Sequence, residues 1–185
     1  ATYVDHWKVH LKETLPQLLK ANKFASENGD PEFASYSIGW FCLSQQLLGK
    51  DLNLLMNQDI DVHAPSIKKL KVGSTTNAFG ILSQFVSNLI HESAAPSYLS
   101  GQYYDESVML PAHIEADDGF SIFFLHLCKM KLAYLLQDFD AALEYGNKCK
   151  QLMKNTAGMV LIPIAYFYHS LVRLALYQRQ GKLKQ

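Results

Sequence analysis

Three cysteines and a nearby histidine are the residues in this chain whose chemistry most often serves catalysis. Cys42, Cys128 and Cys149 are widely spaced and lie inside apolar runs, which favours buried free thiols over a disulfide framework. His126 stands two positions before Cys128, and on a helix two such side chains point about 160° apart. They therefore cannot form a nucleophile and base pair, and we expect core thiols.

Two histidines near the N-terminus have the spacing of a metal site. His6 and His10 lie one helical turn apart, which would let them share an ion. The sequence has no HExxH motif and no third ligand near them. We expect two surface histidines beside Trp7 and no metal.

Acidic and aromatic residues gather in the middle of the chain, where one helix ends and another begins. Glu115, Asp117 and Asp118 either hold a cation or supply helix caps and solvated charge, and capping is the more common use. Tyr103–Tyr104 ahead of Asp105 is typical of a hydrophobic staple over a helix N-terminus.

Motifs of known active sites are not found in the sequence. There is no GxxxxGK[ST] phosphate loop and no HRD or DFG kinase string. Seventeen basic and seventeen acidic side chains balance, which argues against a nucleic-acid or membrane partner. The apolar stretch Met159–Tyr177 is interrupted by Pro163, His169 and Arg173, which favours a buried helix over a membrane span. We expect a noncatalytic cytoplasmic chain without a cofactor.

The chain is organised around residues 119–177. Large apolar side chains recur at offsets of three, four and seven over residues 120–134, and again over 142–153. Asp138 or Asp140 can cap the second of these helices, and so short a connection makes the two helices antiparallel. A helical hairpin is predicted.

Turn residues divide the rest of the chain into further helices. Gly29–Asp30–Pro31 combines a helix stop, an N-cap and a first helical position, and Gly49–Lys50–Asp51 repeats the pattern. No strand is predicted, since no period-two alternation of useful length occurs. The predicted helices cover residues 5–28 with a kink at Pro16, 31–48, 52–70 with a break allowed at His63–Pro65, 105–114, 119–136, 142–153 and 159–177. A further amphipathic helix follows a boundary at Val72–Ser74 and extends to about His91, and residues 92–104 form an ordered loop.

The central hairpin resembles the tetratricopeptide repeat (TPR). Ala142 is a small residue opposite Tyr134 near the start of the second helix, and Phe139 fills the turn. Gly146 stands where that repeat usually has an aromatic residue, and Lys131 where it prefers a small one. We predict an all-α fold of TPR-like antiparallel helical hairpins stacked in a right-handed solenoid of about eight helices.

Short strings along nearly the whole chain share their order and spacing with one family. They are Glu27–Ala34, Gly49–Leu52, Ser87–Leu89, Tyr104–Glu106 with Leu110–Pro111, Leu132–Leu135 with Asp138–Ala142, and Phe167–Leu171. They resemble the central helical region of large bacterial, especially cyanobacterial, signalling proteins. Those proteins join a serine/threonine kinase-like domain, a STAND-type predicted ATPase, a GAF domain and a sensor histidine kinase. The resemblance implies a regulatory segment between the ATPase and the downstream modules, and it carries over no catalytic residue.

A single helical-repeat domain over residues 1–185 is predicted, as a fragment of a larger chain. Two functions remain open. The first is a noncatalytic module for signal transduction that contacts neighbouring domains of its own chain or another protein, with self-association of the fragment. The alternative is a ligand-sensing domain that binds a small molecule or peptide in its groove.

Two apolar surfaces are candidates for the partner contact. The helix over residues 119–136 has a second apolar stripe, which either faces a partner or packs on the preceding hairpin. The helix over Met159–Tyr177 is apolar on nearly all sides, so we expect part of its surface to be buried by another domain or a partner. The candidate residues are Leu125, Cys128, Leu132, Leu135, Ile162, Tyr166 and Phe167.

Overall fold

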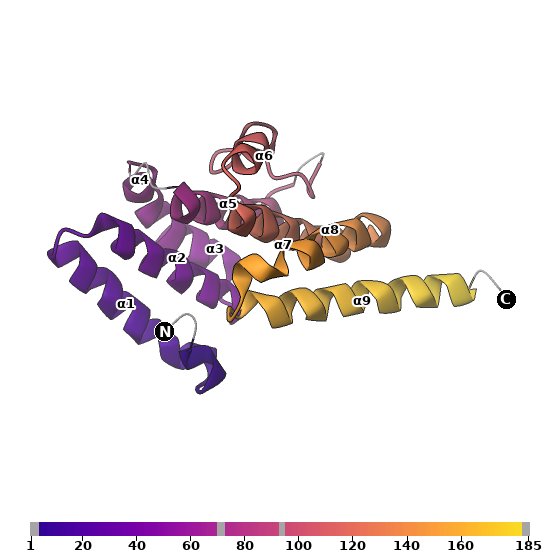
Figure 1. Cartoon of the computed structure of the whole chain (residues 1–185), viewed down its shortest axis with the longest axis horizontal. Helices are drawn as coiled ribbons and strands as arrows, with labels where there is room; N and C mark the ends of the chain where they lie inside the picture. Colours follow the sequence, from indigo (N-terminus) through magenta and orange to yellow (C-terminus); the bar gives the residue numbers. More distant parts are fainter. Residues whose placement is uncertain (1–3, 70–72, 93–94, 183–185) are drawn as a thin grey trace. The chain divides into compact units, whose positions relative to one another are not determined.

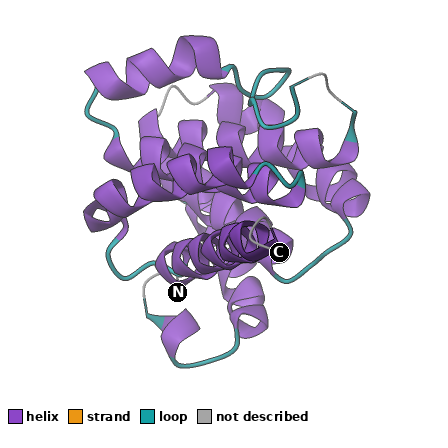
Figure 2. Cartoon of the chain, turned by 90° about the vertical axis from the view of Figure 1, so that its right-hand side faces the viewer, coloured by secondary structure: helices purple, strands orange, loops and turns teal. Residues whose placement is uncertain are grey.

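The computed structural model describes residues 4–69, 73–92 and 95–182, and these residues are mainly helical (Figures 1 and 2). The all-α prediction is confirmed, because the described residues form no strand and contain only one isolated antiparallel bridge, between Ser100 and Asp105. The structure divides into two compact units, Ala1–His91 and Glu92–Gln185. Each unit is described by itself.

The first unit is built around a hairpin of two long helices. Within it, α1 packs on α2, and the Asn22 side chain donates a hydrogen bond of 2.8 Å to the carbonyl oxygen of Ala34. The helix α2 also packs on α5. The elements are η1 (Asp5–Trp7), α1 (Leu11–Glu27), α2 (Pro31–Leu47), α3 (Leu52–Leu55), η2 (Met56–Ile60), α4 (Asp61–Lys69) and α5 (Gly73–Ile90).

The predicted turn chemistry of this unit is confirmed. Gly29 and Gly49 have φ of 71° and 77°, the left-handed conformation that favours glycine after a helix. A carboxylate oxygen of Asp30 accepts a hydrogen bond of 2.9 Å from the backbone N–H of Phe33, and Pro31 follows at the first helical position. Asp51 caps α3 in the same way, through the N–H of Leu54 at 2.9 Å.

The predicted boundaries of the first unit are confirmed only in part. The first long helix begins at Leu11 and not at Asp5, whereas α5 begins at Gly73, within the predicted boundary at Val72–Ser74. Pro65 does not break its helix, because α4 continues from Asp61 to Lys69 with Pro65 inside it. The irregularity in this helical stretch lies earlier, at η2, which is a π-helical turn directly before α4. The predicted end at Leu70 lies outside the described residues.

The second unit contains the predicted central hairpin, which is confirmed. The helix α7 packs on α8, and the Tyr134 and Phe139 rings lie 5.8 Å apart at the turn. Asp138, and not Asp140, caps α8 by accepting a hydrogen bond of 3.1 Å from the N–H of Ala141. The elements are α6 (Glu106–Glu115), α7 (Gly119–Leu135), α8 (Phe139–Leu152), η3 (Met153–Thr156) and α9 (Leu161–Lys182).

A third helix, α9, packs against this hairpin (Figure 1). Ala133, Ala142 and Val172, one from each helix, are fully buried together. A Cβ atom on Gly146 would lie 2.5 Å from Cδ2 of His169 and 3.1 Å from the sulfur of Met130. Gly146 therefore allows α9 to approach α8 closely, and an aromatic residue at this position would not fit.

Candidate functional site

The three thiols have the environment of core residues. Cys42, Cys128 and Cys149 are free and buried, as predicted. Burial raises the pKa of Cys42 and of Cys128 to about 12. It also raises the pKa of Cys149, whose sulfur lies 3.7 Å from the carbonyl oxygen of Phe123. A thiol attacks as a thiolate, so none of these groups is activated as a nucleophile.

The candidate metal ligands have other roles in the described residues. His10 accepts a hydrogen bond of 3.2 Å from the N–H of Lys12 and caps α1, while the His6 ring lies 4.9 Å from that of Trp7. Asp118 caps α7 by accepting a hydrogen bond of 3.1 Å from the N–H of Ser121. Nowhere in residues 4–69, 73–92 or 95–182 do three His, Cys, Asp or Glu side chains come together as a metal site would need.

A buried charged cluster that sequence reasoning missed joins α6 to α7. The ammonium group of Lys129 pairs with the carboxylate of Glu106, and both side chains are more than nine-tenths buried. The N–H of Leu99 donates to the same carboxylate at 3.2 Å. The Lys129 nitrogen also lies 4.8 Å from the centroid of the Tyr145 ring and 5.2 Å from that of Tyr98. Its charge is compensated within the unit, which indicates a structural role.

The apolar stripe of α7 does not form an exposed surface. Leu125, Cys128 and Leu132 are buried, which fits the packing role that the sequence left open and not a partner surface. Leu135, at the end of α7, is 53% exposed.

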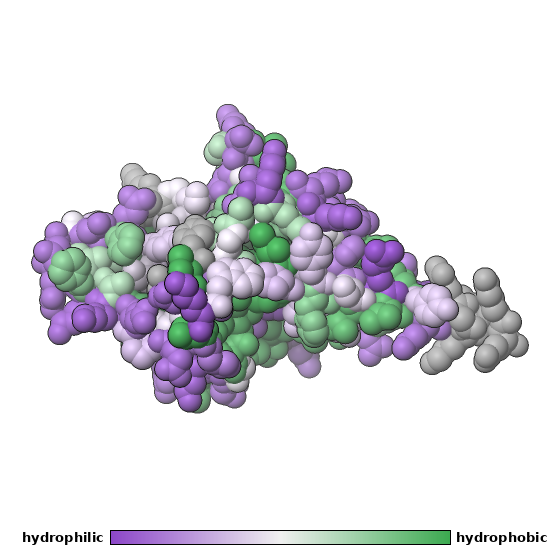
Figure 3. Space-filling view, turned by 60° about the horizontal axis from the view of Figure 1, so that its bottom comes forward, coloured by the Kyte–Doolittle hydropathy of each residue, from purple (hydrophilic) through white to green (hydrophobic). Residues whose placement is uncertain are grey.

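The last helix does present apolar side chains to solvent. Tyr166 and Phe167 are 51% and 60% exposed, whereas Ile162 is only partly exposed. Leu174 and Tyr177, which the sequence did not single out, are 58% and 76% exposed. The four exposed residues Tyr166, Phe167, Leu174 and Tyr177 lie on one side of the helix, and we call them the α9 face. Apolar surface is visible along α9, on the right of the space-filling view (Figure 3).

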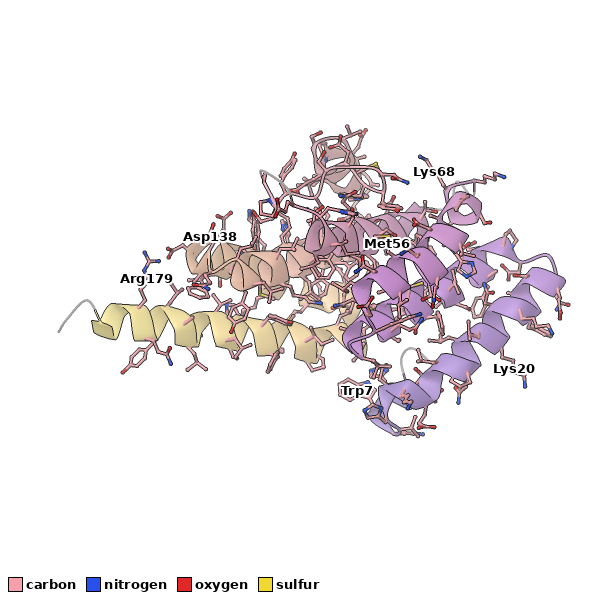
Figure 4. All side chains as sticks on the ribbon, turned by 180° about the vertical axis from the view of Figure 1, so that it is seen from behind. Trp7, Lys20, Met56, Lys68, Asp138 and Arg179 are labelled. Atoms are coloured by element: carbon pink, nitrogen blue, oxygen red, sulfur yellow. The ribbon has the colours of Figure 1, made fainter. Side chains whose placement is uncertain are left out.

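The opposite side of α9 is held by the hairpin. Val172 is fully buried, and the Tyr168 ring lies edge-on to that of Tyr134 at 5.8 Å. Near the end of α9, Arg179 forms an ion pair of 3.2 Å with Asp140 of α8, and it points toward the end of α8 that carries Asp138 (Figure 4). These contacts fix the rotation of α9 about its own axis, so they determine which residues are exposed.

Comparison with known proteins does not assign a family. No model of a protein family, no curated protein and no solved structure matches the chain. Among the described helices, none combines the length and the apolar character needed to pass through a membrane.

Proposed function

We propose that this chain is a noncatalytic helical-repeat interaction module that binds a helix of another protein, or of a neighbouring domain, on the α9 face. The observation that carries the proposal is the exposure of four large aromatic and aliphatic side chains on one side of one helix. Single exposed apolar residues are common on monomeric proteins, whereas contiguous exposed patches mark interaction sites.

The packing of α9 supports the same proposal. In a TPR-like solenoid each helical pair packs against the next, and α9 packs on the α7–α8 hairpin as the first helix of a following repeat would. The signalling proteins that the sequence resembles place such a region between enzymatic modules. A regulatory role in signal transduction in the cytoplasm is part of the proposal.

A selection experiment tests the proposed function. A display library of randomised amphipathic helices is selected for binding to the full chain. The recovered peptides are then tested against Phe167→Glu/Leu174→Glu and against Val108→Glu, which alters a residue of α6 that is also exposed (64%). We expect the α9 variant to lose binding and the α6 variant to keep it. Binders that tolerate the α9 variant, or a selection without binders, would contradict the proposal.

A further inference from the structure

The exposed residues of α9 repeat with the spacing of a coiled-coil seam. Phe167, Ser170, Leu174 and Tyr177 are separated by three, four and three positions, and all four are exposed. We call these four residues the seam. Their spacing places the side chains in one row along the helix, where a second helix can pack at a small crossing angle. Ser170 is small and lies between two large residues, so it leaves a hole that a partner side chain can fill.

The seam is presented on a helix whose other side is already occupied. Val172 and Tyr168 face the hairpin, and Arg179 is tied to Asp140. Because these contacts hold α9 in one orientation, a partner meets a surface that needs little reordering. Surfaces of this kind bind more tightly than flexible ones of the same area, since less conformational entropy is lost.

The charge beside the seam is positive. No aspartate or glutamate occurs anywhere in α9, from Leu161 to Lys182. Arg173 is exposed at the edge of the seam and has no carboxylate within ion-pair distance among the described residues. Arg173 also lies far from the last turn of α9, so the helix dipole does not explain its presence.

From the seam and its charge, we infer that the partner is an amphipathic α-helix with an apolar heptad seam and acidic residues at the flanking positions. This inference rests on the proposed function and specifies its partner. A second copy of α9 would bring like charges at Arg173 together, which disfavours the contact. A membrane surface is also disfavoured, because helices that lie on membranes carry many basic residues on the polar face.

Defined peptides test the inference. Three helical peptides share the same leucine and isoleucine seam and carry glutamate, lysine or glutamine at the flanking positions. Their binding to the full chain is measured by fluorescence anisotropy at low and high salt. We expect the glutamate peptide to bind at least about tenfold more tightly than the lysine peptide at low salt, with a smaller difference at high salt. Arg173→Glu should reverse this preference, and Lys20→Glu, an equal charge change on exposed α1 (Figure 4), should not.

The outcomes separate the inference from the proposed function. Equal binding of all three peptides, lost in Phe167→Glu/Leu174→Glu, would overturn the acidic partner and leave the interaction module in place. No binding of any peptide would contradict both. Self-association tighter than binding of the glutamate peptide, measured by sedimentation velocity, would identify a second copy as the occupant and overturn the inference. Binding to anionic phosphatidylserine vesicles that is lost in the same α9 variant would overturn it in favour of a membrane surface.

Discussion

The ammonium group of Lys129 on α7 and the carboxylate of Glu106 on α6 form an ion pair from which water is almost completely excluded. The two residues are 23 positions apart in the sequence. Glu106 also accepts the N–H of Leu99, and the rings of Tyr98 and Tyr145 lie beside the lysine. The pair therefore connects α6, and the loop residue Leu99 before it, to α7 of the α7–α8 hairpin.

Removing one member of this pair should be strongly destabilising. Glu106→Gln leaves the Lys129 ammonium group buried without its counter-charge, and we expect a loss of about 3–5 kcal/mol in the free energy of unfolding. The double variant Glu106→Gln/Lys129→Met should recover much of that loss, because no buried charge remains. Urea unfolding of the chain measures both. The exposed pair of Glu144 and Lys148 is the control, and Glu144→Gln should have little effect on stability, because solvent screens an exposed pair. Equal losses for the two single variants would contradict this prediction.

The contact between Gly146 and His169 gives a second prediction. Replacing a glycine in a helix by alanine usually stabilises by about 0.5–1 kcal/mol, but at this position the new methyl group would collide with the imidazole ring. We expect Gly146→Ala to destabilise by about 1–3 kcal/mol and His169→Ala in the same chain to remove most of that penalty. Thermal unfolding followed by circular dichroism measures the change.

Gly39 of α2 is the matched control for that substitution. A Cβ atom there would meet only the Phe79 ring at 4.0 Å, an ordinary contact distance. Gly39→Ala should therefore be neutral or stabilising. A Gly146→Ala variant that is as stable as Gly39→Ala would show that α9 does not approach α8 as described.

Acid should destabilise the chain through buried histidines. Burial, reinforced by Lys148 and Lys129 and opposed by Glu144, lowers the pKa of His126 to about 4. An unfolded histidine has a pKa of about 6.5, so between these values the unfolded chain binds a proton that the folded chain excludes. The stability is complete above pH about 6.5 and falls as the pH is lowered toward 4, by up to about 3 kcal/mol from this residue.

A variant isolates the contribution of His126. His126 stacks on the Tyr145 ring at 6.0 Å, so His126→Phe keeps an aromatic contact and removes the titrating group. We expect a smaller loss of unfolding free energy between pH 7 and pH 4 in the variant than in the wild type, measured by urea unfolding across that range. Burial also lowers the pKa of His63, His113 and His169, so part of the acid sensitivity should remain. Identical pH profiles for the two proteins would refute the assignment.

The two aspartates at the start of α8, Asp138 at the N-cap and Asp140 in the first turn, should differ in their effect on stability. Asp138 accepts a hydrogen bond from the N–H of Ala141, whereas Asp140 forms an exposed ion pair with Arg179. Asp138→Ala should cost about 1 kcal/mol, as the loss of an N-cap does, and Asp140→Ala less than about 0.5 kcal/mol. Chemical denaturation of the two variants side by side tests this, and a larger effect at Asp140 would reverse the assignment of the cap.

The helices and most of their ends could be predicted from the sequence because the signals are local. The stop and cap at Gly29–Asp30–Pro31 act through backbone groups within a few residues, and so does the cap of α3 by Asp51. The α7–α8 hairpin follows from two apolar periodicities joined by a short turn. These features require no knowledge of distant parts of the chain. Where the prediction was wrong, as at Pro65, the error concerned how one residue is accommodated within a helix.

The candidate site depended on contacts between residues far apart in the sequence. The sequence of α9 is apolar on nearly all sides, so periodicity does not indicate which side is exposed. That choice is made by the close approach of His169 to Gly146 and by the burial of Val172 with Ala133 and Ala142. The pairing of Glu106 with Lys129 is likewise invisible to a local pattern, because a buried charge is tolerated only where a partner from another element meets it. Helix formation is decided by neighbouring residues, whereas the exposed face of a helix is decided by the helices that pack against it.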